Sequence, residues 1–330
     1  MKRPFAHIAG TGHAVPKRVV TNIDIAAMGI ETDDAWIIER TGIRQRHIAS
    51  DGESLTSLSA EAARQAMARA GVQPGEIDTI ILGTASPDHL LPATAVEVQT
   101  VLGCTRAAAF DLAAACSGFL YGAIVGESLI ASGSADTVLV IGAEKLSAIV
   151  DWTDRNTCIL FADGAGAAVL RRTRGGQKGI LSSYMRSDGA LAELLWRPAG
   201  GGAEPFSPEV FEGRRQFVRM AGREVFKHAV RSMAEATDRA LDAARLTAAD
   251  IDLLIPHQAN VRIIEATAKH AGISMDKVFI NVDRFGNTSA ASIPIALNDA
   301  IEQGRVKEGM TVLFAAFGAG FTWGSLVVRF

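Results

Sequence analysis

Three residues far apart in the chain carry side chains that could perform chemistry together: Cys116, His257 and Asn287. Cys116 follows three alanines and precedes Ser117–Phe119, where we expect a helix to begin. The free N–H groups at a helix N-terminus favour thiolate over thiol and can hold an oxyanion. This turn could therefore supply a nucleophile and half of an oxyanion hole. The alternative for Cys116 is a buried structural cysteine.

The other two residues suit the stabilisation of an enolate. A cysteine thiolate attacks a thioester readily and forms an acyl-enzyme. Decarboxylation of a malonyl thioester would then supply a carbon nucleophile without a base that removes a C–H proton. The developing enolate oxygen needs two neutral hydrogen-bond donors, which the imidazole of His257 and the carboxamide of Asn287 would provide. The alternatives are that Asn287 is only a turn or helix-cap residue and that His257 is only a loop histidine.

Self-similarity within the chain indicates how these residues come together. Short apolar strands alternate with alanine-rich helices, which is typical of an α/β protein. The helix, turn and strand of the segment that ends at Gly83 resemble those of the segment that ends at His257, with Asp78 matching Asp252 at an offset of 174 residues. With a local offset of 171 residues, Cys116 corresponds to Asn287. In a duplicated α/β fold, the turns after matching strands can meet at one cleft.

Each candidate residue is expected to follow a strand. His257 comes directly after the apolar run 252–255. Cys116 follows the expected strand 110–112, and the segment 280–282 lies near the equivalent position before Asn287. The glycine-rich segment 317–324 also follows an expected strand. We expect it to form a tight hairpin and to direct one backbone N–H toward that of Cys116.

Composition favours a globular, cytoplasmic protein. The 330 residues are 48% hydrophobic and 21% charged, which is enough to bury a large core. The net charge of −3 and the scattered basic residues make nucleic acid an unexpected partner. The N-terminal segment does not resemble a signal peptide, and we expect no apolar run of about 18 residues that could span a membrane.

Neither disulfides nor bound cofactors are expected. The three cysteines lack paired spacing, and the histidines other than His257 have no metal-ligand spacing, so we expect a reducing compartment and no metal. Val15 stands where a dinucleotide-binding fingerprint beginning at Gly10 would need its third glycine, so NAD binding has no support.

The chain resembles β-ketoacyl-acyl carrier protein synthase III, a condensing enzyme family of the thiolase superfamily. The similarity runs almost from end to end, through GTGHAVPKRVVTN, WIIERTGIRQRHIA, FDLAAACSGF, FADGAGAAVL, PHQANVRII, DRFGNTSAASIP and FGAGFTWGS. It implies a five-layered αβαβα fold of two duplicated α/β halves, residues 1–178 and 179–330, assembled as a homodimer. It further implies that an acyl-CoA primer acylates Cys116, and that His257 and Asn287 promote decarboxylation of malonyl-acyl carrier protein.

The resemblance also assigns binding residues, with coenzyme A as part of a substrate rather than a cofactor. In the family, a tryptophan and an arginine hold the adenine of coenzyme A, and Trp36 and Arg155 match them. The other matched coenzyme A and pantetheine positions are Thr32, Arg40, Gly222, Ala259 and Asn260. Lys227 and Arg262 fall where basic residues meet coenzyme A or the acidic carrier protein.

Three positions depart from the family pattern. Ala319 replaces the middle of three glycines, and its N–H, the expected second oxyanion donor, is retained only if φ there is negative. Arg223 replaces an asparagine near the pantetheine. Leu91 stands where a phenylalanine of the partner subunit often closes the acyl pocket. The preferred primer is therefore left open.

Other functions fit the sequence less well. Thiolases need a second cysteine near the C-terminus, but no cysteine follows Cys158. Elongating ketosynthases use a second histidine where this chain has Asn287. A specialised homologue that makes a signal molecule, a polyketide starter or an ester would keep all three candidate residues. A non-catalytic module that binds coenzyme A or an acyl carrier would not need Cys116, His257 and Asn287 together.

Overall fold

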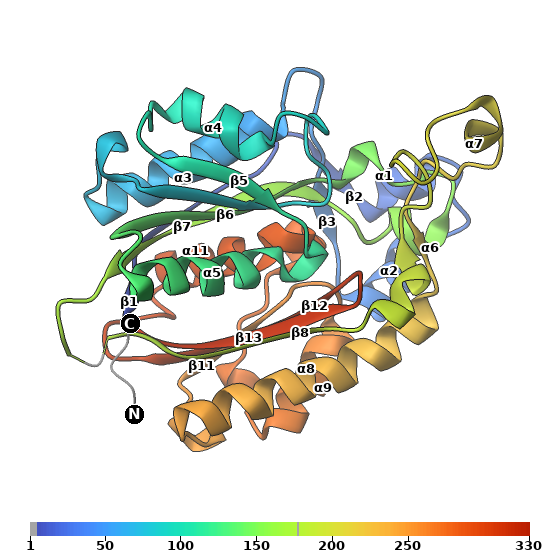
Figure 1. The fold of residues 1–330 in the computed structure, drawn as a ribbon. Helices are drawn as coiled ribbons and strands as arrows, with labels where there is room; N and C mark the ends of the chain where they lie inside the picture. The colour runs from blue at the N-terminus through green and yellow to red at the C-terminus, as the bar shows by residue number, and fades with distance from the viewer. Residues whose placement is uncertain (1–4, 177) are drawn as a thin grey trace.

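The computed structural model describes residues 5–176 and 178–330 and has five alternating layers of helices and sheets (Figure 1). The upper sheet has the strand order β1 (Ala6–Ala14), β7 (Asp163–Arg172), β6 (Thr137–Lys145), β4 (Thr79–Gly83), β5 (Ala108–Leu112). The lower sheet has the order β8 (Gly179–Ser187), β13 (Thr322–Arg329), β12 (Thr311–Gly318), β11 (Leu253–Pro256). The predicted αβαβα thiolase-like arrangement is confirmed.

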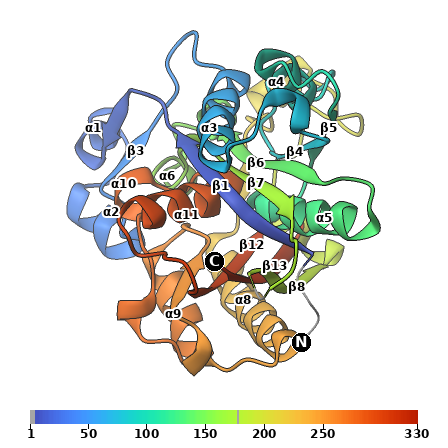
Figure 2. The same cartoon turned by 90° about the vertical axis from the view of Figure 1, so that its left-hand side faces the viewer.

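Helices cover both faces of each sheet. The upper outer layer contains α3 (Leu55–Ala70) and α4 (Thr94–Leu102), and the lower outer layer contains α8 (Gly222–Ala244) and α9 (Val261–Ala271). Between the sheets lie α5 (Gly118–Ser132) and α11 (Ser292–Glu302). Figure 2 shows the same layers from the side, with α11 next to β1. Because both faces of each sheet are covered, central strands such as β6 are apolar runs without alternation.

The shorter elements flank these layers. They are α1 (Asn22–Ala27), α2 (Asp34–Thr41), α6 (Arg155–Cys158), α7 (Pro208–Glu212), α10 (Val282–Phe285), β2 (Val19–Thr21), β3 (Gln45–His47), β9 (Leu195–Trp196) and β10 (Arg219–Met220). Two 3₁₀ turns matter for the site: η2 (Ala115–Ser117) and η7 (Ser289–Ala291). Each lies directly before a helix of the middle layer, α5 or α11.

The two sheets repeat one connection in detail. The Asp78 N–H donates to the Thr137 carbonyl at 3.0 Å, and the Asp252 N–H donates to the Thr311 carbonyl at 2.9 Å. The carboxylate of each aspartate accepts from the N–H of the same threonine, at 3.0 and 2.8 Å. The offset of 174 residues therefore corresponds to a real structural repeat. The predicted boundary after residue 178 lies in the link between β7 and β8, and the division into two domains stays an interpretation.

The second repeat lacks a counterpart of β5. We expected residues 280–282 to correspond to the strand before Cys116, but this segment is irregular at Ile280 and enters α10 at Val282. Only an isolated bridge between Leu254 and Val278 extends the lower sheet at this edge. The expectation that Asn287 follows a strand is therefore wrong, because the chain reaches Asn287 from a short helix.

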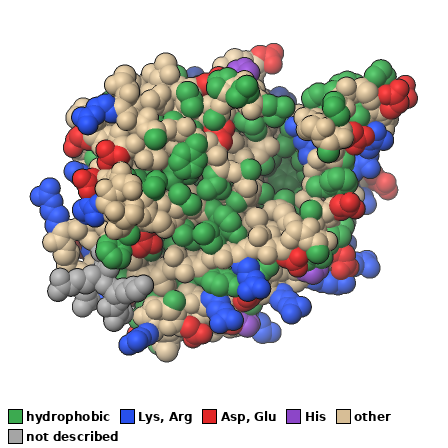
Figure 3. Space-filling view, in the orientation of Figure 1, with side chains coloured by type: hydrophobic (Ala, Val, Ile, Leu, Met, Phe, Trp, Pro, Cys, Tyr) green, Lys and Arg blue, Asp and Glu red, His purple; other side chains and the backbone are tan. Residues whose placement is uncertain are grey.

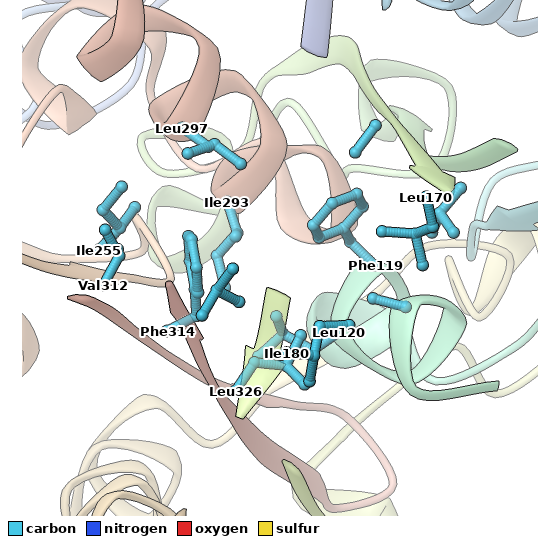
Figure 4. Close-up of a cluster of buried hydrophobic side chains, with 14 of the residues drawn as sticks. Phe119, Leu120, Leu170, Ile180, Ile255, Ile293, Leu297, Val312, Phe314 and Leu326 are labelled. Carbon is cyan, nitrogen blue, oxygen red and sulfur yellow. The ribbon is translucent and has the colours of Figure 1, made fainter. Parts of the chain in front are cut away.

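The core between the sheets is continuous. Figure 4 shows Phe119 and Leu120 of α5 and Ile293 and Leu297 of α11 among strand side chains of both sheets. By length and composition, the 18 residues Ala115–Ser132 could cross a membrane, so the expectation that no such apolar run exists is wrong. This stretch is 56% buried and packs against β4 and β6 of the upper sheet and β13 of the lower one. Its hydrophobicity is therefore explained by its place in the core.

One surface contrasts with this covered core. The strand β5 forms the edge of the upper sheet and leaves Phe110 38% exposed. Figure 3 shows hydrophobic side chains gathered over the middle of the face that presents β5 and α5.

Candidate active site

One cavity of about 690 Å³ contains the three predicted catalytic side chains. Cys116, His257 and Asn287 all line it, although they come from η2, the end of β11 and the turn after α10. All three are buried, with exposed fractions of 9%, 4% and 5%. The remaining wall is mostly apolar and includes Leu195, Val225, Phe226 and Phe317. The structure therefore brings a thiol, an imidazole and a carboxamide together in a largely apolar site.

Cys116 is held by close packing of the backbone. It lies in the 3₁₀ turn η2, two residues before α5 begins at Gly118. A Cβ atom on Gly318, the last residue of β12, would lie 2.6 Å from the Cys116 backbone nitrogen. Glycine is therefore required at Gly318 for β12 to approach the nucleophile this closely. The preceding residue, Ala115, has a φ of +45°, which is a strained conformation for alanine.

The environment of Cys116 does not favour the free thiolate. Burial raises the pKa of the Cys116 thiol to about 12, and this effect outweighs the hydrogen bond from Ser289, which lowers it. The negative charge of Glu144 nearby raises the pKa further. The expectation that the helix N-terminus alone would favour the thiolate is therefore wrong, since burial dominates in this structure.

His257 is fixed as a neutral imidazole. Its backbone N–H donates to the Ala315 carbonyl at 2.8 Å, at the end of the paired strands β11 and β12. Burial lowers the pKa of the imidazole to about 4. The Ser292 hydroxyl lies 2.6 Å from Nδ1 and also accepts from the Gln258 N–H at 3.3 Å. With Ser292 as donor to Nδ1, the ring proton is on Nε2.

Asn287 is oriented in a similar way. Its backbone N–H donates to Leu160 and its carbonyl accepts from Ala162, each at 2.9 Å. The side-chain Oδ1 accepts from the backbone N–H of Ser289 at 2.9 Å. Since an N–H donor requires the oxygen at this position, Nδ2 is the carboxamide atom left for the cavity. The site can thus present two neutral donors, Nε2–H of His257 and Nδ2–H of Asn287.

The glycine-rich segment forms a hairpin, as expected. It connects β12 and β13, which pair antiparallel from Gly318 opposite Thr322. Ala319 lies in this turn, directly after the residue that contacts Cys116, and its φ is not positive. Alanine therefore meets the condition for retaining the backbone conformation. The role of the Cys116 and Ala319 N–H groups as oxyanion donors stays a prediction.

Most of the predicted binding residues line the same cavity. They are Trp36, Arg40, Gly222, Lys227, Ala259, Asn260 and Arg262. Arg155 contacts the cavity wall through Trp36, since its guanidinium carbon lies 4.8 Å from the centre of the indole ring. Arg40 lies 4.7 Å from the same ring. Both cations thus lie against the indole ring, an aromatic surface on which a planar base can stack.

Besides Arg155 and Ala319, two more predicted residues lie outside the cavity lining. Thr32 has a buried hydroxyl group that lacks a hydrogen-bond partner in the described structure, but it does not line the cavity. Leu91 is 88% exposed and likewise does not line the cavity of its own chain. Leu91 could reach an acyl pocket only in another subunit, as the resemblance implies. Arg223, the third departure from the family pattern, does line the cavity.

Sequence reasoning missed the polar residues that support the catalytic side chains. Ser292 holds His257, and Ser289 holds both Asn287 and Cys116. Glu144 is fully buried and hydrogen-bonded to Ser289 at 3.0 Å. Both serines lie within the segment DRFGNTSAASIP around Asn287. A count of hydroxyl groups near that residue could therefore have indicated them. Nothing in the sequence around Glu144 distinguishes it from a surface carboxylate at a strand end.

Comparison with known proteins shows the family to which this chain belongs. The family models for 3-oxoacyl-[acyl-carrier-protein (ACP)] synthase III and for its C-terminal part match residues 110–189 and 241–330. The β-ketoacyl-[acyl-carrier-protein] synthase III of Roseiflexus castenholzii is 52% identical over 325 residues, 98% of either chain. This chain belongs to the β-ketoacyl-[acyl-carrier-protein] synthase III family. It is therefore a condensing acyltransferase of that class.

Solved structures agree with the family assignment. The crystal structure of the synthase III from Aquifex aeolicus VF5 superimposes with a TM-score of 0.91 at 46% identity, covering 98% of this chain and 100% of that one. The priming β-ketosynthase of the R1128 polyketide pathway has a TM-score of 0.90 at 32% identity, covering 99% and 96%. The synthase III family and a polyketide-priming enzyme thus share this architecture.

Proposed function

We propose that this synthase III condenses an acyl-CoA primer with malonyl-acyl carrier protein to start type II fatty acid synthesis. The observation that carries the proposal is the shared cavity of Cys116, His257 and Asn287, whose wall also includes Trp36 and Arg40. The acyl-CoA acylates Cys116 and coenzyme A leaves. Malonyl-acyl carrier protein then enters and loses CO₂, and its enolate attacks the acyl-enzyme to give a 3-ketoacyl product.

Each catalytic group has a separate task in this proposal. Cys116 is the nucleophile, and the Cys116 and Ala319 N–H groups hold the oxyanion of the acyl group. His257 and Asn287 donate hydrogen bonds to the enolate oxygen. Because the imidazole is neutral, it can donate from Nε2 while Ser292 donates to Nδ1. Loss of one such donor typically costs roughly 3 kcal/mol of transition-state stabilisation.

The same proposal assigns the residues that bind coenzyme A and the carrier protein. Trp36 and Arg155 hold the adenine of coenzyme A between them, with Thr32 and Arg40 near the nucleotide and phosphates. Gly222, Ala259 and Asn260 border the pantetheine. Lys227 and Arg262 attract phosphates or the acidic carrier protein at the cavity entrance. The thioester substrates supply the chemistry, so no further cofactor is required.

The experiment separates the two half-reactions. The wild-type protein is incubated with acyl-CoAs from acetyl to octanoyl, and acylation is followed by intact-protein mass spectrometry. Wild type should gain one acyl group, and Cys116→Ala should gain none. His257→Ala and Asn287→Ala should be acylated but should release CO₂ from malonyl-acyl carrier protein at least a hundredfold more slowly. Equal loss of both steps in all three variants would contradict the division of roles.

We also propose a cytoplasmic homodimer. The three cysteines are free thiols, which fits a reducing compartment. The unpaired edge of β5, with the exposed Phe110, and the exposed Leu91 support self-association. In such a dimer Leu91 would close the acyl pocket of the partner. A smaller side chain than phenylalanine there would leave room for a longer or branched primer.

A second candidate is the priming step of a polyketide pathway. The likeness to the R1128 priming β-ketosynthase favours it, because that enzyme shares this fold at 32% identity. The same acyl-CoA panel distinguishes the two candidates when malonyl-carrier proteins of both pathways are offered as acceptors. Preference for the fatty acid carrier protein supports the first function, and preference for the polyketide carrier protein supports the second.

A further inference from the structure

A buried carboxyl group lies behind the nucleophile. Glu144, near the end of β6, is 0% exposed. Its Oε2 accepts hydrogen bonds from the Ser86 hydroxyl at 2.5 Å, the Ala85 N–H at 3.1 Å and the Thr84 hydroxyl at 3.2 Å. Each of these partners is neutral. Oε1, the other oxygen, points toward η7, where Ser289 lies 3.0 Å away.

Ser289 connects this carboxyl group to Cys116. Its hydroxyl group donates to Glu144 Oε1 at 3.0 Å, and because η7 packs against η2, the same hydroxyl lies near the Cys116 thiol and lowers its pKa. Ser289 has a φ of +49°, which is a strained conformation for a non-glycine residue. The surrounding structure therefore holds the hydroxyl where it is. A Cβ on Gly142 of β6 would lie 2.2 Å from the Ala290 carbonyl, so η7 sits directly on the strand that carries Glu144.

Few titratable or charged groups face Glu144 among the described residues. The titratable group that faces it from η2 is the Cys116 thiol itself. The loop after β4 and the turn η7 face it with hydroxyl groups. Across β7 its register partner is Gly164, and the next pair along is Lys145 opposite Asp163. Lys145 Nζ donates to the Glu53 carbonyl at 2.9 Å.

We propose that Glu144 accepts the Cys116 proton through the Ser289 hydroxyl during acylation and returns it after condensation. This inference rests on the proposed function, because it concerns the proton of the acyl-transfer step. Ser289 touches the reacting sulfur, whereas Glu144 acts only through Ser289.

The Cys116 proton stays within the site from acylation until condensation. As the sulfur–carbon bond to the acyl group forms, the Cys116 proton moves to the Ser289 oxygen and the Ser289 proton moves to Glu144 Oε1. Coenzyme A leaves as a thiolate and takes a proton from water. When the enolate attacks the acyl-enzyme, the carbon–sulfur bond breaks and the Cys116 sulfur regains its proton from Glu144 by the reverse path. Each cycle thus consumes one proton from water.

The electrostatics suit this storage of a proton. Burial raises the pKa of the Cys116 thiol to about 12, so spontaneous loss of its proton to neutral water is rare. Burial also raises the pKa of Glu144, which makes the carboxyl group a better proton acceptor than an exposed glutamate. Because Glu144 is inaccessible to solvent, a proton placed there during acylation remains near the sulfur until condensation.

Glu144→Gln tests the relay with little change in shape. The glutamine oxygen can accept from Thr84, Ala85 and Ser86, and its NH₂ group can donate to Ser289, but the amide cannot take up a proton. Ser289→Ala breaks the same path one step earlier. Asp163→Asn is the matched control, because Asp163 is also a fully buried carboxyl group held by a backbone N–H and a hydroxyl, and it does not line the cavity.

Single-turnover acylation is measured by mass spectrometry between pH 6 and 9 with the acyl-CoA that wild type accepts best. Wild type and Asp163→Asn should show rates that change little with pH. Glu144→Gln should be about a hundredfold slower at pH 7, and its rate should rise about tenfold per pH unit because hydroxide must remove the proton. Ser289→Ala should show the same slope. The double variant should be no slower than the slower single variant, since both changes break one path.

Several outcomes would overturn the relay. One is a wild-type rate retained in Glu144→Gln; another is a slower rate with an unchanged flat pH profile, which indicates only a structural role. Additive losses in the double variant would also contradict a single path. Should Glu144→Gln fail to fold, the pH slope of Ser289→Ala decides the question. If wild type is acylated by none of the acyl-CoAs, the proposed function itself fails, and the relay fails with it.

Discussion

At the scale of single residues, the site depends on hydrogen bonds to Ser292 and Ser289 that fix which atom of His257 and Asn287 faces the cavity. The Ser292 hydroxyl lies 2.6 Å from Nδ1 of His257, and because it accepts from the Gln258 N–H, we infer that it donates to Nδ1. The Ser289 N–H donates to Oδ1 of Asn287 at 2.9 Å. Both bonds leave an N–H donor for the enolate. A His257 or Asn287 with the opposite orientation would present an acceptor, which would repel the enolate oxygen.

Ser292→Ala should therefore impair decarboxylation without affecting acylation. Without the hydroxyl, the imidazole can place its proton on Nδ1, and the Nε2 donor is lost in part of the molecules. We expect CO₂ release from malonyl-acyl carrier protein to fall about tenfold, with the acylation rate within a factor of two of wild type. Ser182→Ala is the control, since Ser182 also donates one hydrogen bond, to Ala240, but lies outside the cavity.

The pH dependence of the same assay checks the neutral imidazole. Burial lowers the pKa of His257 to about 4, below its ordinary value of 6.5. The neutral ring is thus present above about pH 5 and is lost as the pH falls through 4. Because the unfolded state binds this proton first, the same shift makes folding less favourable as the pH falls from 6.5 to 4. An activity loss centred near pH 6.5, with the fold intact, would contradict this assignment.

The sequence was sufficient to predict that the three candidate catalytic residues share one site, but not which residues support them. The chemistry of a thiol, an imidazole and a carboxamide, together with the internal repeat, indicated Cys116, His257 and Asn287. Ser292 and Glu144 act through contacts across 35 and 145 residues of sequence, with His257 and Ser289 respectively. A serine or glutamate has many possible roles, and only the packing of distant elements decides which role it has. The same holds for the pKa of Cys116, which depends on burial more than on the turn that carries it.

At the scale of elements, the nucleophile depends on the close approach of β12 to η2. A Cβ on Gly318 would lie 2.6 Å from the Cys116 nitrogen and 3.0 Å from the Cys116 Cβ. A real Cβ atom essentially never lies 2.6 Å from a backbone nitrogen, so one of the two backbones must move. Since η2 also contacts β13 and η7, any such movement displaces Cys116 relative to the hydroxyl of Ser289.

Gly318→Ala should therefore slow acylation strongly. We expect a loss of at least tenfold in the rate of Cys116 acylation and a destabilisation of about 1–3 kcal/mol from overpacking. Mass spectrometry and urea unfolding measure the two effects. Gly201→Ala is the matched control, because a Cβ at Gly201 meets no atom within 4 Å. Equal acylation by the two variants would mean that the hairpin adjusts without moving the nucleophile.

Elements were predictable where their residues have regular patterns. The apolar runs of β4, β6 and β11 and the turns around Asp78 and Asp252 identified both halves of the fold. The segment 280–282 misled the prediction, because its match to the first half did not include the partner strand that would make it part of a sheet. A short segment at a sheet edge forms a strand only when pairing is available, and here the chain turns into α10 instead.

At the scale of the whole molecule, the duplicated layers bury the central strands β4, β6 and β12 but leave β5 at an edge of the upper sheet. Such an edge offers unpaired N–H and C=O groups, and soluble proteins usually protect it by charge, covering or pairing. The strand Ala108–Leu112 has no lysine or arginine, and Phe110 is 38% exposed on it. Pairing with the β5 of a second copy would continue the upper sheet across both subunits and cover this side chain.

Phe110→Lys should therefore weaken the proposed dimer. A buried, unpaired lysine on both copies of a twofold interface opposes association, and the change lies outside the cavity lining. We expect sedimentation velocity to show a dimer for wild type and a larger monomer fraction for the variant at micromolar concentration. Met275→Lys serves as the control, because Met275 is similarly exposed, at 41%, but lies in the turn after α9.

The monomer fraction of Phe110→Lys should also accept long acyl-CoAs differently from wild type if Leu91 of a partner closes the acyl pocket. A wild-type monomer with full activity would show that neither β5 pairing nor Leu91 contributes to catalysis.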